Sequence, residues 1–391
     1  MKRKGFLFGI LILSIFHIRG QSGYKMKANE ETIDVNFLSS YYHQDGNNSA
    51  VQGGLGGEEL LDIANILVVN IPLDSVRSIH TTIGADYYSS ASTDRIDANV
   101  SSASIKDIRV YGSVGYQKKN LIGGSTYRME LGGSIEYDYA SIHGSVGYSK
   151  EWNEGNTEWS VKAQAFIDQW KPIYPAELRR DVQLNNKGRR SFNFSSVLSQ
   201  VINQKTQISL GGDFIYMQGL LSTPFHRVYF ADQENPDIER LPTSRIKIPV
   251  SIRVNHFLND HMIVRSWYRY YWDDFGIKGH TANIEIPVLV SESLRLSPYY
   301  RFHNQTGADY FAGYRAHLST EEFYTSDYDL SDLHSHMVGL GIGYYPTFGI
   351  TSTNLTGRTL TFKSIETKLS YYKRSTGLNA YIGSINFQFQ L

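Results

Sequence analysis

Apolar and polar side chains alternate along most of this chain, in segments of about ten residues that begin near Glu31. Because neighbouring side chains of a β-strand point to opposite faces, such a segment has one apolar and one polar face. In the last segment Tyr381 and Phe387 share one face, while Asn386 and Gln388 share the other. The pattern therefore predicts an all-β protein.

Sixteen segments alternate in this way, at residues 32–42, 61–71, 78–88, 107–117, 126–138, 141–150, 158–169, 192–202, 207–217, 245–257, 262–272, 282–291, 294–303, 336–345, 362–372 and 379–391. The second and eighth alternate poorly, which leaves their register open. Short connections such as 204–206 alternate with long ones such as 304–335, although 139–140, 273–281 and 346–361 depart from the rule. Short turns, long loops and an even strand number are typical of bacterial outer-membrane barrels. We therefore expect an antiparallel transmembrane β-barrel of about 16 strands, with 14 possible.

A secreted β-sandwich also shows alternation and is the alternative fold. Two features of the apolar face favour the barrel. It contains residues such as Gly112, Gly133 and Ala163, which fill a close-packed core poorly, whereas lipid tails adapt to any shape. Aromatic residues gather at its strand ends, as in the interfacial girdles of barrels. They are Tyr41, Tyr87, Tyr116, Tyr137, Tyr148, Trp159, Tyr216, Tyr270, Trp272, Tyr344 and Tyr371.

The N-terminus has the pattern of a secretory signal peptide. Lys2, Arg3 and Lys4 precede an apolar stretch at residues 5–18, and Gln21 is a plausible first mature residue. The sequence therefore predicts a cleaved signal peptide at 1–20 and an outer-membrane β-barrel at 21–391, with an N-terminal anchor as the alternative. The expected location is the bacterial outer membrane.

Composition excludes several classes of protein. Lys+Arg 38 against Asp+Glu 38 gives a formal net charge of zero, which argues against a nucleic-acid binder. Because the chain has no cysteine, it has no disulfide, no thiolate-bound zinc or iron–sulfur centre, and no lipid-modified cysteine. We expect no cofactor.

Three segments resemble an uncharacterised family of bacterial outer-membrane proteins, a domain of unknown function. They are residues 222–230 (STPFHRVYF), 324–330 (YTSDYDL), and 34–41 (DVNFLSSY) with its turn at 45–48. The resemblance covers nearly the whole mature chain. It implies an outer-membrane location and a barrel topology, and it brings no catalytic residues.

A barrel of this size leaves an interior wide enough for water, which the charges of the polar face would line. In the first nine strands the expected inward acidic residues are Asp34, Asp86, Glu130, Glu136, Glu158, Asp168 and Asp213, against Arg109, Arg128 and Lys162. In the last seven the expected inward basic residues are Arg245, Lys247, Arg253, Arg265, Arg269, Arg295, Arg301 and Lys368, against Glu285 and Glu366. We therefore expect an acidic wall opposite a basic wall, whose field orients polar solutes.

Less specific interpretations of these charges also stand. They can pair across strands, as Glu285 can with the arginines beside it, and simply solvate a wet interior. Likewise, the basic loop 170–190 and the acidic loop 304–335 can pair over the mouth or remain solvated.

The sequence contains one weak candidate for a metal site and little sign of an enzyme. Asp327, Asp329 and Asp332 precede His334 and His336, a set that can bind a divalent cation. A solvated acidic loop explains these residues better, so we expect no metal. There is no Gly-x-Ser-x-Gly elbow, and a triad of His226 with Asp232 is only a coincidence of composition.

Three functions remain open at this stage. The first is a porin-like channel for small polar or charged solutes. Its expected partners are these solutes, outer-membrane lipid and the barrel-assembly machinery, and we expect no nucleic-acid partner. The second is a non-conducting scaffold or interaction barrel, whose interior would be filled by loops or by inward aromatic residues. They are Tyr88, Tyr111, Phe166, Tyr271 and Tyr299. The third, a minor alternative, is an outer-membrane hydrolase.

Overall fold

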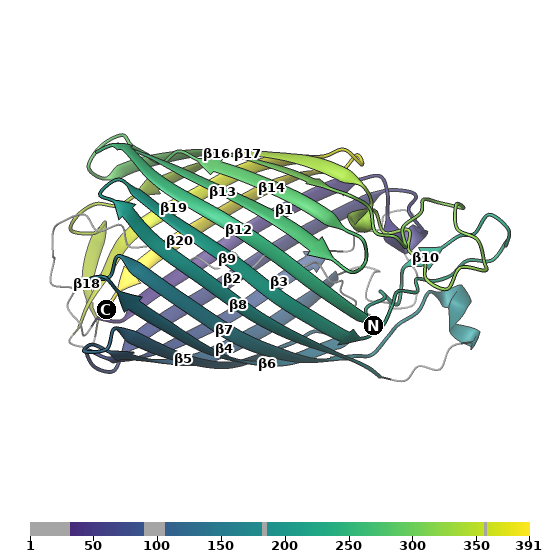
Figure 1. Ribbon diagram of the computed structural model, residues 1–391, viewed down its shortest axis with the longest axis horizontal. Helices are drawn as coiled ribbons and strands as arrows, with labels where there is room; N and C mark the ends of the chain where they lie inside the picture. Colours follow the sequence, from purple (N-terminus) through teal and green to yellow (C-terminus); the bar gives the residue numbers. More distant parts are fainter. Residues whose placement is uncertain (1–31, 90–105, 182–185, 356–357) are drawn as a thin grey trace.

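A closed antiparallel β-barrel forms nearly the whole molecule (Figure 1). The computed structural model describes residues 32–89, 106–181, 186–355 and 358–391, so the predicted signal peptide lies outside the described residues. The sixteen barrel strands are β1 (Asp34–Gly46), β2 (Glu58–Pro72), β3 (Arg77–Ser89), β4 (Lys106–Asn120), β5 (Ser125–Ile135), β6 (Tyr139–Trp152), β7 (Thr157–Trp170), β8 (Lys187–Asn203), β9 (Thr206–Gly219), β12 (Ser244–Asn259), β13 (Met262–Asp273), β14 (Lys278–Glu285) continued by β15 (Val288–Leu289), β16 (Leu294–Gln305), β17 (Leu333–Tyr344), β19 (Arg358–Arg374) and β20 (Asn379–Gln390).

Each strand pairs with its neighbours along the chain, and the first strand closes the barrel against the last. Asp34 of β1 lies opposite Gln390 of β20, and Asp45 lies opposite Asn379. Every predicted segment corresponds to one of these strands, so the expected barrel of sixteen strands is confirmed and the sandwich is wrong.

The apolar face of the strands is the outer surface of the barrel. Residues opposite each other in the register share a face, and this places Ile83 of β3 beside Leu67 and Gly112. Side chains diverge on the convex side of a closed sheet and converge on the concave side. Accordingly Ile83 is 55% exposed, whereas Asp86 of the same strand is 6% exposed. The alternation of the sequence therefore separates an apolar outside from a polar inside.

The two ends of the barrel differ. At one end Ile33 and Leu391 are hydrogen-bonded to each other, and the turns at 73–76, 121–124, 153–156, 204–205, 260–261 and 290–293 are short. The connection from β17 to β19 belongs to this end too, and its described part, residues 345–355, contains β18 (Thr351–Leu355), which pairs with the start of β19. The long loops extend beyond the other end (Figure 1).

The long loops contain the remaining secondary structure. These elements are the 3-10 helices η1 (Ala50–Gln52), η2 (Ala176–Asp181) and η3 (Tyr328–Leu330), and the short strands β10 (Arg227–Val228) and β11 (Asp237–Ile238), which pair with each other. Among the described residues, no helix has the length and apolar character that crossing a membrane requires.

Candidate functional site

The inner wall of the barrel carries the residues that the sequence singled out. On β12, β13, β16 and β19, the face opposite the exposed apolar side chains carries the predicted basic residues. They are Lys247, Arg253, Arg265, Arg269, Arg295, Arg301 and Lys368. The structure thus places all seven toward the interior.

Some of these basic side chains are neutralised by the wall itself. Arg265 lies 3.7 Å from Glu285 of the neighbouring strand, and Lys368 lies 3.4 Å from Glu366. By contrast, within the described residues no carboxylate oxygen lies within 4.0 Å of the four remaining arginines. These are Arg253, Arg269, Arg295 and Arg301. Pairing across strands (Arg265 with Glu285) and within β19 (Lys368 with Glu366) therefore neutralises part of the basic wall and leaves an excess of positive charge.

The predicted acidic residues lie on the inner face of β3, β5, β7 and β9. They are Asp86, Glu130, Glu136, Glu158, Asp168 and Asp213. Several have local partners: Asp168 accepts a hydrogen bond from Arg189 at 2.8 Å, and Glu136 lies 3.6 Å from Arg109. In a ring of sixteen strands β3 faces β13 and β5 faces β16, so the acidic residues of β3 and β5 lie across the interior from the arginines. Glu158 and Asp168 on β7 face Lys368 on β19, whereas Asp213 on β9 lies beside β12 and so on the basic side of the wall.

Asp62 also belongs to the acidic wall, although sequence reasoning missed it. It lies opposite Tyr88 of β3, whose side chain points inward beside Asp86. The alternation of β2 is weak because Ile66 and Val68 face inward and Asn65 faces outward, so the register of this strand could not be read from the sequence.

The inward aromatic residues lie along the wall. A Cβ atom added to Gly84 would stand 2.2 Å from the Tyr111 ring, and one added to Gly339 would stand 2.4 Å from the Tyr299 ring. Each ring therefore occupies the space that its neighbouring glycine leaves. The other three predicted aromatic residues also have partners on the wall: Tyr88 donates to Glu136, Tyr271 donates to Asp273, and Phe166 packs on His143.

Four loops meet at the long-loop end, and we call them the cap: residues 47–57, 171–181, 220–243 and 306–332. Arg227, of which 7% is exposed, connects three of them. It donates to Glu177 at 2.5 and 3.2 Å and to the carbonyl oxygen of Val51 at 2.6 Å. In addition, Phe225 packs on Val51.

These contacts extend across the mouth of the barrel. Loops 47–57 and 220–243 lie half a ring apart, with eight strands from β2 to β9 on one side and eight on the other. A spacing of about 4.8 Å between strands and a tilt of about 40° give a barrel roughly 30 Å wide. Loops that start this far apart can only touch by extending over the mouth, so the cap covers it.

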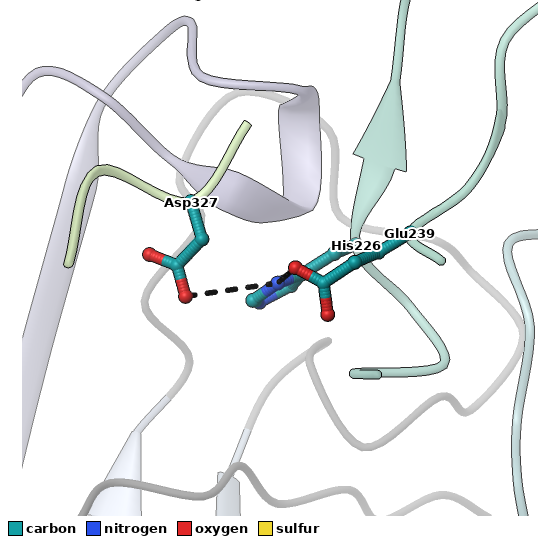
Figure 2. A group of neighbouring side chains, drawn as sticks. All are labelled: His226, Glu239 and Asp327. Carbon is teal, nitrogen blue, oxygen red and sulfur yellow. Dashed lines mark hydrogen bonds and ion pairs between the residues drawn. The ribbon is translucent and has the colours of Figure 1, made fainter. Parts of the chain in front are cut away.

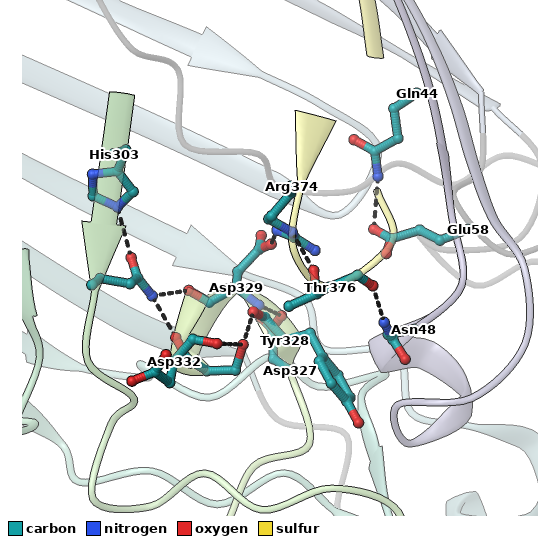
Figure 3. Close-up of polar contacts among 12 residues, drawn as sticks. Gln44, Asn48, Glu58, His303, Asp327, Tyr328, Asp329, Asp332, Arg374 and Thr376 are labelled. Carbon is teal, nitrogen blue, oxygen red and sulfur yellow. Dashed lines mark hydrogen bonds and ion pairs between the residues drawn. The ribbon is translucent and has the colours of Figure 1, made fainter. Parts of the chain in front are cut away.

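The cap is also tied to the rim of the barrel (Figure 3). Gln305 at the end of β16 donates to the carbonyl oxygens of Asp329 and Ser331 at 3.0 and 2.9 Å. Arg374 at the end of β19 pairs with the Asp329 carboxylate. Loop 306–332 is therefore held at its base by two strands.

A cluster of two buried residues, His226 and Glu239, and the half-buried Asp327 joins two loops of the cap (Figure 2). The His226 Nδ1 atom lies 3.4 Å from Glu239 Oε1 and 3.9 Å from Asp327 Oδ2. Burial raises the pKa of Asp327, and the neighbouring Asp329 carboxylate raises it further. Burial is the largest single influence on the pKa of His226 and lowers it, but the carboxylates of Glu239, Asp327 and Glu58 together raise it, so the net pKa lies above its ordinary value.

The structure separates the residues of the predicted metal site. Asp327 joins His226 and Glu239, whereas Asp329 pairs with Arg374 and Asp332 lies beyond η3. His334 and His336 share the outer face of β17, where His336 contacts Tyr300, and so point away from the carboxylates. The sequence contained no signal for Glu239, because its approach to His226 depends on the loop conformation alone.

A family model described as "Protein of unknown function (DUF3570)" matches residues 85–387. The chain belongs to this family. No curated protein matches this chain. A solved structure described as a bacterial polysaccharide outer membrane secretin is similar, with a TM-score of 0.48, 10% identity, and coverage of 93% of this chain and 99% of that one. The siderophore receptor PirA from Pseudomonas aeruginosa (TM-score 0.44, 10% identity, 91% and 80% covered) and OccK1 (OpdK) from Pseudomonas aeruginosa (0.42, 7%, 92% and 98%) are also similar.

Two of the three segments that carried the resemblance lie within the range matched by the DUF3570 model and contact each other in the cap. The Phe230 ring packs edge-on against the Tyr324 ring at 5.0 Å, and Thr325 donates to Glu239 at 2.6 Å. The third segment, 34–41, precedes the matched range and forms most of β1. The match therefore covers less of the N-terminal part than expected.

The triad considered for a hydrolase does not form in this DUF3570 protein. Asp232 accepts hydrogen bonds from the backbone N–H and the hydroxyl of Ser319, both at 2.9 Å. His226 instead faces Glu239 and Asp327.

Proposed function

We propose that this protein is an outer-membrane channel for small polar or charged solutes, with a basic wall opposite an acidic wall. The observation that carries the proposal is the set of four inward arginines without a carboxylate partner in the described wall, on the side of the barrel across from Asp86 of β3 and Glu130 of β5. Unpaired charges fixed in a low-dielectric wall produce an electric field across the interior. A wall that only had to be hydrated could do so with neutral polar side chains.

The outer surface supports the membrane location and the expected partners. Its apolar side chains are largely exposed, for example Leu131 at 73%, and hydrocarbon is the solvent that such a band needs. The proposed partners are outer-membrane lipid, small polar solutes and the barrel-assembly machinery, with no nucleic acid. No enzymatic activity forms part of the proposal.

Solute passage would depend on the cap. Tyr111 and Tyr299 occupy the space beside wall glycines, and the other three inward aromatic residues contact neighbouring wall side chains, so all five lie along the wall. The cap spans the mouth, so we propose that it opens, or leaves gaps between its loops, when solute passes.

Reversing charge on the basic wall tests the proposal. With Arg265→Glu and Arg269→Glu together, the reversal potential in a salt gradient across a planar bilayer should shift toward cation selectivity, because a net charge of −4 is added to the wall. The matched control, Arg240→Glu with Lys205→Glu, adds the same charge at exposed positions outside the interior and should leave the potential unchanged. An unchanged potential in the wall variant would overturn the assignment.

The second candidate function is a non-conducting scaffold, and the cap favours it. Loops tied across the mouth by Arg227 form a continuous surface that a partner protein can bind. Single-channel recording separates the two functions, since a folded barrel inserted in the bilayer that never conducts would support the scaffold.

A further inference from the structure

The cluster of His226, Glu239 and Asp327 has the chemistry of a metal site. One imidazole nitrogen and two carboxylates come together from loops 220–243 and 306–332, and the ligand atoms all lie within 4.8 Å of one another (Figure 2). Imidazole favours zinc and other first-row transition metals, whereas Ca²⁺ and Mg²⁺ prefer sites made of oxygen atoms alone.

The distances fit a shared cation better than direct hydrogen bonds. His226 Nδ1 and Glu239 Oε1 form a long hydrogen bond of 3.4 Å, and Asp327 Oδ2 lies 3.9 Å from the same nitrogen. Both distances exceed the length of about 2.7–2.9 Å that is usual for a hydrogen bond between charged nitrogen and oxygen. In a tetrahedral zinc site with bonds of about 2.0–2.2 Å, neighbouring ligand atoms lie about 3.3–3.6 Å apart. The distance from His226 to Glu239 falls within this range, and a small rotation of Asp327 would bring its oxygen there.

The two carboxylates are already oriented by other groups. Glu239 accepts hydrogen bonds from the Thr325 hydroxyl at 2.6 Å and from the Thr223 backbone N–H at 2.5 Å. Asp327 caps η3 by accepting from the Asp329 N–H at 2.9 Å. Ligand carboxylates in metal sites are held by hydrogen bonds of this kind.

The charge balance around the cluster also favours a cation. The Glu239 side chain is only 2% exposed, and a buried carboxylate is costly unless positive charge compensates it. The nearby arginines pair elsewhere: Arg374 with Asp329, and Arg227 with Glu177. An imidazolium at His226 would compensate one of the two carboxylates, whereas a divalent cation would compensate Glu239 and Asp327 together.

We propose that His226, Glu239 and Asp327 bind a first-row divalent transition metal, Zn²⁺ above all, that cross-links two loops of the cap. Three protein ligands leave a fourth position for water. Because residues 222–230 and 324–330 also pack through Phe230 and Tyr324, the metal would fasten an interface that already exists.

Titration of the purified full-length protein in detergent with ZnCl₂, followed calorimetrically, tests the site. We expect saturation at one Zn²⁺ per chain. Asp327→Asn should weaken binding by about tenfold or more while keeping the cap of η3, since asparagine is also a good N-cap. His226→Gln should do the same. His334→Gln, which removes a histidine on the lipid-facing side, should bind as the wild type does.

Failure to fold must be distinguished from loss of a ligand, so each variant is first checked for the heat-dependent gel shift of an intact barrel. A second measurement uses only the wild type: ZnCl₂ should slow trypsin cleavage after the exposed Arg315 in loop 306–332, and MgCl₂ should not. Absence of saturable Zn²⁺ binding, wild-type affinity in both ligand variants, or no effect of Zn²⁺ on cleavage would overturn the proposal. None of these results depends on conductance, so the channel function is tested separately.

Discussion

The contacts of Arg227 predict that one substitution will loosen the cap. In Arg227→Gln the bidentate pair with Glu177 and the hydrogen bond to the Val51 carbonyl are lost. These are the polar contacts by which loop 220–243 holds two loops from other parts of the ring, so we expect the cap to open more often.

The size of the effect can be worked out from burial. A hydrogen bond from a charged group to a buried carbonyl contributes about 1.5–3 kcal/mol. The Glu177 side chain is 44% exposed, so its pairing with Arg227 is screened by solvent and adds about 0.2–1 kcal/mol. The total of about 3 kcal/mol corresponds to roughly a hundredfold change in the ratio of closed to open cap.

Single-channel recording in planar bilayers measures this ratio as the fraction of time spent in the high-conductance state. The control is Arg240→Gln, which removes an arginine from the same loop whose side chain is 58% exposed and 4.0 Å from Asp237. If Arg227→Gln and Arg240→Gln gave the same open fraction as the wild type, the cap would not control the mouth.

Two further predictions test the rim and the lipid-facing surface. Asp273→Ala should lower the free energy of unfolding by about 3–5 kcal/mol and make the turn at 274–277 susceptible to limited proteolysis, because the fully buried carboxylate accepts hydrogen bonds from Arg245, Tyr271 and two backbone N–H groups. The control Asp274→Ala removes only an exposed hydrogen bond and should have little effect on either measurement. Leu131→Arg, near the middle of the outer face of β5, should lower the free energy of unfolding in lipid vesicles by about 2–4 kcal/mol. The control Ser145→Arg, on the inner face beside Glu130, should lower it much less. Equal losses in urea titrations of the two variants would contradict the assignment of faces.

The strands and their faces could be predicted because two solvents determine them locally. Lipid on one side and water on the other select alternating residues within each strand, and this pattern needs no knowledge of distant residues. The prediction from alternation failed where apolar side chains also face the interior. In β2 these are Ile66 and Val68, and in β8 it is Val197. Asp62 was missed for this reason.

The placement of the inward charges was likewise predictable, but their pairing was not. Arg265 and Glu285 lie on adjacent strands, so their contact follows once the register is known. Which arginines keep a free charge depends on side-chain geometry that alternation does not encode.

The sequence by itself determined the barrel, a strand number of about sixteen and, outside β2 and β8, the face on which the strand side chains lie, because a period of two is a local consequence of the solvent on each side of a sheet. Only the tertiary structure decided the cap and its cluster. Arg227 reaches the carbonyl of Val51 across 176 positions of sequence, and His226 meets Asp327 from a different loop. Loops have no periodic pattern, and their contacts arise only when barrel closure brings opposite sides of the ring to a common mouth.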